Sequence, residues 1–368
     1  MDGFLSNASL DGCEKMASNP YFSVIIPTYK RGHIIDYALD GLTKQTFKNF
    51  EAVIVIRSSG DETEERVDSY ADRLRIRKFT LSDRWQHWDQ LNYGISKAQG
   101  SVLAFLDDDA VPLPNWLELQ SQIYVGPNIG GIAGNVLTAR IVNGNAVPME
   151  QDASEIIIRY EPALENIGAY FWLKPLSGLE NNLIYITKAG TVEKNTHFNA
   201  NAHIKSVLGM GANMSVSRKA MGSFLFPPLW TGSQWEQFLG WHLWRRGYAL
   251  VFWPEIKVYH LAHGQTISRF IKDKNMISAR EAGIVLFFYN LYGLEKQLSM
   301  MHKVVSTMFK SAEFIRKMAK DKDTYQAKLK GLIYGNLLGI TWLISKGLKL
   351  KYTPSETLKT KMPRSKTS

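Results

Sequence analysis

Segments with strand and helix patterns alternate between residues 22 and 106, and this alternation restricts the chain to few folds. Short apolar runs rich in β-branched residues predict strands, and runs with apolar residues three and four apart predict helices. The expected strands are 22–27, 50–56, 75–80 and 101–106, and the expected helices are 34–44, 64–74 and 89–99. A helix between two strands carries the chain back across the sheet, so successive strands run parallel. We therefore expect an α/β fold with a mostly parallel central sheet flanked by helices.

Three consecutive carboxylates, Asp107, Asp108 and Asp109, follow the apolar run at 101–106. Adjacent like charges repel one another, and burying them without partners costs free energy. Ligands of α/β proteins bind at the carboxyl ends of the strands, and a divalent cation there would relieve this cost. A solvated acidic turn is the alternative that this stretch alone leaves open.

The chain after residue 116 is less regular. We expect a mixed segment that covers the sheet over 117–206, with extended pieces near 130–141 and 156–160. A glycine-rich turn at 209–216 comes before a predicted helix at 234–247, a strand at 248–253 and a short extended piece at 257–263.

The net charge of +10 lies in the C-terminal part of the chain. Residues 291–368 hold 16 Lys/Arg and 5 Asp/Glu, a balance of +11, whereas residues 1–290 hold 28 and 29. A basic region favours an anionic partner, either a membrane or a nucleic acid. Long apolar stripes interrupt the basic residues and no nucleic-acid-binding signature occurs, so we expect a membrane surface and no nucleic acid.

Two helices are expected in this basic region. Apolar residues three and four apart form one stripe over 298–319, and Lys and Arg take the opposite side. A second helix at 329–344 lies in an uncharged stretch of about 15 residues, fewer than the ~20 that span a bilayer. We expect residues 284–351 to lie on an anionic membrane. The alternative is that both helices pack against the body of the protein or a second copy.

The single cysteine, Cys13, excludes an internal disulfide framework and is typical of a reducing compartment. Residues 1–20 lack the apolar core of a secretory signal, so we expect a flexible arm there. These features favour a cytoplasmic location.

Six motifs occur in a recognisable order: VIIPTYKR at 24–31, Asn92-x-Gly94-x-x-x-Ala98-x-Gly100, the acidic triplet, GANMSVSRKAM at 211–221, WEQFLGWHLWRRGY at 235–248 and VYHLAH at 258–263. In this order they resemble the inverting glycosyltransferases of family 2, which have the GT-A fold. The resemblance covers about residues 22–265.

The resemblance implies a metal and a nucleotide-sugar donor. Asp107 and Asp109 match the Asp-x-Asp signature that holds Mn²⁺ or Mg²⁺ on the donor diphosphate, and His260 matches a further metal ligand. Asp107 and Asp108 would also contact the nucleotide. The other implied donor contacts are Pro27, Thr28, Tyr29, Arg31, Arg57 and Asn92, and the implied sugar or acceptor contacts are Gly211, Asn213 and Trp235.

Glu236 is the catalytic base that the resemblance implies. The family places an acid at the start of a helix about a dozen residues before Gly-Tyr, here Gly247-Tyr248. A base would take the proton of the acceptor hydroxyl as it attacks the anomeric carbon. Trp235 replaces the acid that usually precedes it. The alternative role for Glu236 is a first-turn glutamate that the helix dipole favours.

Arg57 stands where the family usually has an aspartate that reads the nucleotide base, so the resemblance does not identify the nucleotide. It implies an inverting, metal-dependent hexosyltransferase that acts on a lipid-linked or cell-envelope glycan, peripheral on the cytoplasmic face of the membrane. A soluble enzyme that dimerises through its C-terminal helices and a non-catalytic nucleotide- or glycan-binding module are the alternatives.

The expected organisation follows from these assignments. We expect a flexible arm at 1–20 and a GT-A domain at 21–277, which divides into a nucleotide-binding half (21–116) and an acceptor half (117–277). A helical, basic, amphipathic region at 278–352 and a disordered basic tail at 353–368 would follow it.

Overall fold

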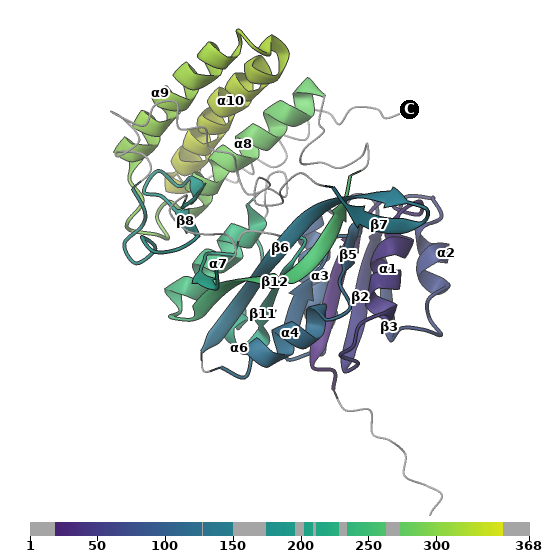
Figure 1. Cartoon of the computed structure of the whole chain (residues 1–368). Coiled ribbons are helices and arrows are strands. Elements are labelled where there is room, and N and C mark those ends of the chain that lie inside the picture. The colour runs from purple at the N-terminus through teal and green to yellow at the C-terminus, as the bar shows by residue number, and fades with distance from the viewer. Residues whose placement is uncertain are drawn as a thin grey trace, which may run out of the picture.

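A sheet of ten strands forms the centre of the computed structural model, with helices on both of its faces (Figure 1). The structure describes residues 19–126, 128–149, 174–195, 202–208, 211–227, 234–262 and 273–348. The predicted N-terminal arm and C-terminal tail and the extended piece at 156–160 lie outside the described residues.

The strands are β1 (Phe22–Thr28), β2 (Phe50–Arg57), β3 (Ile76–Leu81), β4 (Val102–Phe105), β5 (Ala110–Pro112), β6 (Ile129–Val142), β7 (Asn145–Pro148), β8 (Ile184–Ile186), β9 (Val192–Lys194), β10 (Ile204–Lys205), β11 (Met214–Ser217) and β12 (Ala249–Leu261). The helices are α1 (Ile35–Thr43), α2 (Thr63–Asp68), α3 (His87–Lys97), α4 (Trp116–Ile123), α6 (Arg218–Met221), α7 (Trp235–Arg245), α8 (Lys274–Leu291), α9 (Met300–Lys317) and α10 (Lys322–Gly347).

The main path of the sheet has the strand order β10-β12-β6-β11-β4-β1-β2-β3. The strands β3, β2, β1 and β4 are mutually parallel, and β6 is parallel to β12. Because β11 is antiparallel to both β4 and β6, these two groups run in the same direction. Six of the eight strands on the path therefore share one direction, which confirms the mostly parallel α/β sheet.

Alternate residues of the central strands pack into two separate cores. Ile25 and Leu103 face the core that contains α3 and α7, whereas Val24 and Ala104 face the core that contains α1 and α4. Both faces of a parallel sheet are covered by its crossover helices, and this explains the continuous apolar runs of β1 and β2. Their carboxyl ends emerge at the edge where the candidate site lies.

The elements predicted between residues 22 and 106 are all present, and the largest difference in length is in α2. Helix α2 ends at Asp68, and turns follow it up to Leu74, where we expected one helix over 64–74. The predicted strand at 248–253 and the extended piece at 257–263 form a single strand, β12, with an irregularity in its pairing between Trp253 and Lys257. Pro254 lies in this irregularity and does not end the strand.

Over residues 273–348 the structure has three helices, not two. Helix α10 packs against both α8 and α9, and α8 spans residue 278, where we expected the appendage to begin (Figure 1). Phe287 of α8 and Leu332 and Leu338 of α10 belong to the same buried core as Ile25 of β1. Among the described helices, none has the length and apolar character that crossing a bilayer requires.

Glycines at four-residue intervals allow the close contact between α8 and α10. A β-carbon at Gly335 would lie 2.9 Å from the Cα atom of Ala282, and one at Gly331 would meet the carbonyl oxygen of Ser278. Gly339 faces the ring of Tyr289 in the same way. Residues four apart share one side of a helix, so this side of α10 lies directly on α8.

We predict that Gly331→Ala lowers the melting temperature, because the added methyl group meets backbone that cannot rotate away. Overpacking of this kind costs about 1–3 kcal/mol. Gly347→Ala in the same helix is the matched control, because nothing lies within 4 Å of the added carbon. Thermal unfolding of both variants checks this, and an unchanged melting temperature for Gly331→Ala would contradict the close packing of α8 and α10.

Candidate active site

The acidic triplet lies where two parts of the sheet meet. Strand β4 is buried between β1 and β11 and delivers Asp107 to the carboxyl edge. The chain then turns into β5, which pairs antiparallel with β12 so that Ala110 lies opposite His260. The backbone N–H of Leu261 also donates to the carbonyl oxygen of Asp109 at 2.9 Å. This register holds His260 beside the triplet.

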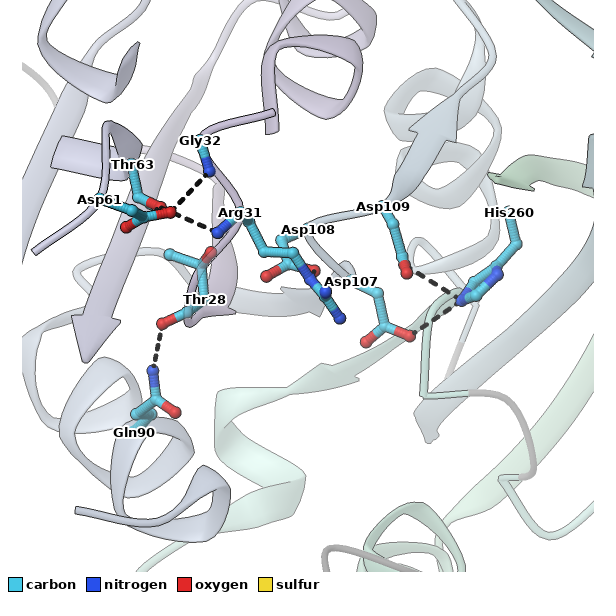
Figure 2. Close-up of polar contacts among 10 residues, drawn as sticks. All are labelled: Thr28, Arg31, Gly32, Asp61, Thr63, Gln90, Asp107, Asp108, Asp109 and His260. Atoms are coloured by element: carbon cyan, nitrogen blue, oxygen red, sulfur yellow. Dashed lines mark hydrogen bonds and ion pairs between the residues drawn. The ribbon is translucent and has the colours of Figure 1, made fainter. Parts of the chain in front are cut away.

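Asp107, Asp109 and His260 form a group that fits a divalent cation (Figure 2). Nε2 of His260 lies 3.1 Å from Oδ1 of Asp109 and 3.5 Å from Oδ2 of Asp107. One ligand atom from each residue lies within 4.8 Å of the other two. Two carboxylates and one imidazole are donors that divalent metals accept in proteins. The side chain of Asp107 is 36% exposed and that of Asp109 is 6% exposed, so the group opens toward solvent on the Asp107 side.

Asp108 points away from its two neighbours and pairs with Arg31. The Nε atom of Arg31 lies 3.1 Å from Oδ1 of Asp108, and both side chains are nearly buried (Figure 2). Burial raises the pKa of Asp108 to about 7, and the charge of Arg31 opposes this rise. Of the three adjacent acids, two therefore face His260, and the third ties the triplet to the loop after β1.

Glu236 lies in the first turn of α7. Burial raises the pKa of this carboxyl group, and the negative charge of Asp107 acts in the same direction, whereas a hydrogen bond from Gln237 and the charge of Arg280 oppose the rise; the resulting pKa is about 7. Glu236 is therefore in electrostatic reach of the acidic group on one side and of α8 on the other. A carboxyl group with a pKa near 7 can accept a proton at neutral pH.

Trp235 forms a wall beside Glu236. Its ring centroid lies 5.4 Å from those of Phe105 and Phe226, and the side chain is only 6% exposed. A β-carbon at Gly211 would lie 2.7 Å from this indole, so a residue with a side chain does not fit there without a shift. The predicted pair Gly211 and Trp235 is thus in contact.

The residues predicted to hold the nucleotide lie at the carboxyl ends of β1 and β2. The guanidinium carbon of Arg57 lies 3.3 Å from the ring centroid of Tyr29, and Nη1 of Arg57 donates to the carbonyl oxygen of Trp85 at 3.1 Å. Thr28 is 2% exposed, and its carbonyl oxygen accepts a hydrogen bond from Gln90 (Figure 2). Pro27 is buried within β1 opposite Val55.

Two of the predicted contacts hold the backbone instead. The side chain of Asn213 is fully buried: its oxygen accepts from Nε1 of Trp116, and its nitrogen donates to the carbonyl oxygens of Asn135 and Ile256. It therefore has no exposed atom for a sugar or an acceptor, and that assignment was wrong. Asn92 exchanges hydrogen bonds of 2.8 Å with the backbone N–H and carbonyl of Phe226. The ring of Phe226 in turn packs against Trp235.

Two further residues near the site have no signal in the motifs. His87 begins α3, and its ring lies 5.8 Å from that of Trp235. Burial lowers the pKa of His87, with the charge of Asp107 opposing and that of Arg57 adding to the shift, so the ring is neutral at pH 7. Arg280 reaches the site from α8, about 45 residues after Glu236. Only the folded arrangement brings either residue to this place.

The sequence model of the family described as glycosyl transferase family 2 matches residues 23–201, which include the acidic triplet. Glycosyltransferase AglE of Haloferax volcanii is 32% identical over 120 residues, which cover 32% of this chain and 40% of that protein. UDP-Glc:alpha-D-GlcNAc-diphosphoundecaprenol beta-1,3-glucosyltransferase WfgD of Escherichia coli is 30% identical over 146 residues, which cover 40% of this chain and 56% of that protein. The chain thus spans less than two thirds of the length of these curated relatives.

Solved structures share the fold. The mannosyltransferase PcManGT from Pyrobaculum calidifontis, in complex with GDP-Man and Mn²⁺, superposes with a TM-score of 0.50 over 93% of this chain and 84% of that chain. GalNAc-T7, with UDP, GalNAc and Mn²⁺, superposes with a TM-score of 0.51 over 89% and 58%. Both are 14% identical to this chain, so the likeness supports the GT-A fold alone. In sequence, the chain is similar to glycosyl transferase family 2 over residues 23–201, just under half of its length.

Proposed function

We propose that the chain is an inverting, divalent-metal-dependent hexosyltransferase that uses a nucleotide-sugar donor. The observation that carries this proposal is the placement of Asp107, Asp109 and His260 at the carboxyl edge of the sheet, with Glu236 in electrostatic reach. Asp107, Asp109 and His260 would hold Mn²⁺ or Mg²⁺, which supplies positive charge to the departing diphosphate. Two carboxylates suit either ion.

Glu236 is the base in this proposal. Its carboxylate accepts the proton of the acceptor hydroxyl, whose oxygen forms a bond to the anomeric carbon. The bond between that carbon and the diphosphate oxygen breaks, and its electron pair leaves with the nucleoside diphosphate. Attack on the face opposite the leaving group inverts the configuration. Trp235 and Gly211 would line the sugar or acceptor, beside Glu236.

Residues after β1 and β2 would hold the nucleotide. Thr28, Tyr29, Arg31 and Arg57 lie on the same edge of the sheet as Asp107 and Asp108. Arg57 stacks on Tyr29 and would hold this ring in place beside the nucleotide. This arrangement supports donor binding.

The acceptor in this proposal is a hydroxyl of a lipid-linked or cell-envelope glycan. The support is the similarity to WfgD, whose name gives a diphosphoundecaprenol-linked acceptor. The basic C-terminal helices support a location at the cytoplasmic face of a membrane, where such acceptors would lie.

The first test is of the donor site. We expect one of UDP, GDP and dTDP to raise the melting temperature only when Mn²⁺ is present, because a ligand that binds the folded state stabilises it. Asp109→Asn should remove this shift, and Asp68→Asn, which changes an exposed acid on α2, should keep it. A shift that survives Asp109→Asn would refute the metal assignment, and no shift with any nucleotide would favour a non-catalytic module.

The second test is of the base. We predict that Glu236→Gln binds the nucleotide and Mn²⁺ normally but releases nucleoside diphosphate from the matching nucleotide-sugar at least about 100-fold more slowly, a typical effect of losing a general base. In the unmodified chain, kcat/KM should fall as the pH drops below about 7, because protonated Glu236 accepts no proton. Glu65→Gln, on the exposed side of α2, is the control, and normal turnover by Glu236→Gln would place the base elsewhere.

The third test uses stability. The pKa of Glu236 is raised from 4.5 to about 7 by burial. The contribution of this group to the free energy of unfolding is thus most favourable below pH 4.5, where the carboxyl group is protonated in both states. It is lost as the pH rises through 7, because the buried group then becomes charged. We expect the melting temperature of Glu236→Gln, relative to the unmodified chain, to be higher at pH 8 than at pH 5. A difference that stays constant between pH 5 and pH 8 would mean that Glu236 is not held in a dry site.

A further inference from the structure

Helix α9 turns its polar side to the body of the protein and its apolar side outward. Two polar residues, Lys303 and Ser306, are buried together with Phe314, whereas Met301 is 58% exposed and Met308 is 66% exposed. The exposed apolar residues are Met301, Val304, Met308 and Ile315, which share one side of the helix. This is the reverse of a helix that packs its apolar stripe on a core. The stripe predicted over 298–319 is present; Leu298 at its start is buried in the core, and the exposed residues named above face away from the protein.

The inward face of α9 is specifically accommodated, so this orientation is built into the packing. The ammonium group of Lys303 lies 5.3 Å from the ring centroid of Phe288 and 5.9 Å from that of Tyr289, both on α8. Lys317 forms an ion pair of 2.8 Å with Glu313 along the same helix. Burial still lowers the pKa of Lys303 to about 7, so the aromatic rings offset only part of the cost of burying this group.

Helix α10 exposes a second apolar stripe. Ile333, Leu337, Ile340, Ile344 and Leu348 are each at least 45% exposed. At 3.6 residues per turn, this stripe lies on the side of the helix opposite the glycines that contact α8. Helices α9 and α10 lie side by side (Figure 1). Together the two stripes expose nine large apolar side chains.

Basic residues are exposed on the same two helices and in the turn between them. They are Arg316, Lys320, Lys322, Lys330 and Lys346. The exposed acids of these helices are engaged: Asp321 caps α10 by accepting from Thr324, and Asp323 pairs with Lys274 at 2.8 Å. A second copy would bring a surface of the same charge to this face, and a nucleic acid would offer nothing apolar. An anionic bilayer offers both acyl chains and negative headgroups.

We infer that the outward sides of α9 and α10 form a binding surface for an anionic membrane. Met308 and Leu337, in the middle of the two stripes, would enter the boundary between headgroups and acyl chains, while the surrounding Lys and Arg contact the headgroups. This goes beyond the proposed reaction, since it does not depend on turnover.

The test is co-sedimentation of the full chain with vesicles of phosphatidylcholine alone and of an equal mixture of phosphatidylcholine and phosphatidylglycerol. We expect binding to the anionic vesicles that weakens with salt. Met308→Gln combined with Leu337→Gln should weaken it at least about tenfold, because two side chains no longer leave water. Val125→Gln combined with Leu225→Gln is the matched control, since these residues are 84% and 59% exposed on other parts of the chain.

Three outcomes would overturn the inference. In the first, the unmodified chain binds neither kind of vesicle. In the second, the test pair and the control pair bind the anionic vesicles equally well. In the third, the chain is a dimer without lipid and the test pair makes it a monomer, which would mean that a second copy covers this surface. Glu236→Gln should bind vesicles normally, which separates this inference from the proposed reaction.

Discussion

The antiparallel pairing of β5 with β12 is the interaction on which the site depends. It brings His260 to Asp107 and Asp109 although the chain between them includes most of the second half of the sheet. A shift of this pairing by one residue would turn the side chain of His260 to the other face of the sheet. The hydrogen bond from Leu261 to Asp109 and the pairing of β12 with β6 hold the register from both sides.

The site divides its charges among different partners. Asp108 has Arg31, Asp107 and Asp109 face His260, and Glu236 lies in a drier place between the acidic group and Arg280. Burial raises the pKa of both Asp108 and Glu236, and a different arginine opposes the rise at each of them. This separation is what a metal group and a base require if both are to work at one pH.

The sequence predicted the strands and helices of the first hundred residues because apolar period and β-branched content decide them locally. It also predicted the acidic triplet, His260 and Glu236 as candidates, through ordered motifs. It failed where contacts between distant residues decide: Asn213 is a hydrogen-bonding centre among three separate segments, and His87 and Arg280 reach the site through packing. A helical period likewise shows that α9 has two different sides, but it does not show which side faces inward. The contact of Lys303 with Phe288, which forms only in the folded chain, identifies the inward side.

The close contact between α8 and α10 also affects how the chain can be divided. Leu332 and Leu338 of α10 share a core with Phe287 of α8, and α8 carries the arginine whose charge acts on Glu236. The last helix is therefore not a detachable anchor. Deleting α10 would leave α8 uncovered and disturb the electrostatic surroundings of Glu236. A shortened chain would therefore change both its membrane binding and its activity, and the two effects could not be separated. Point substitutions on the outer sides of α9 and α10 keep the two apart.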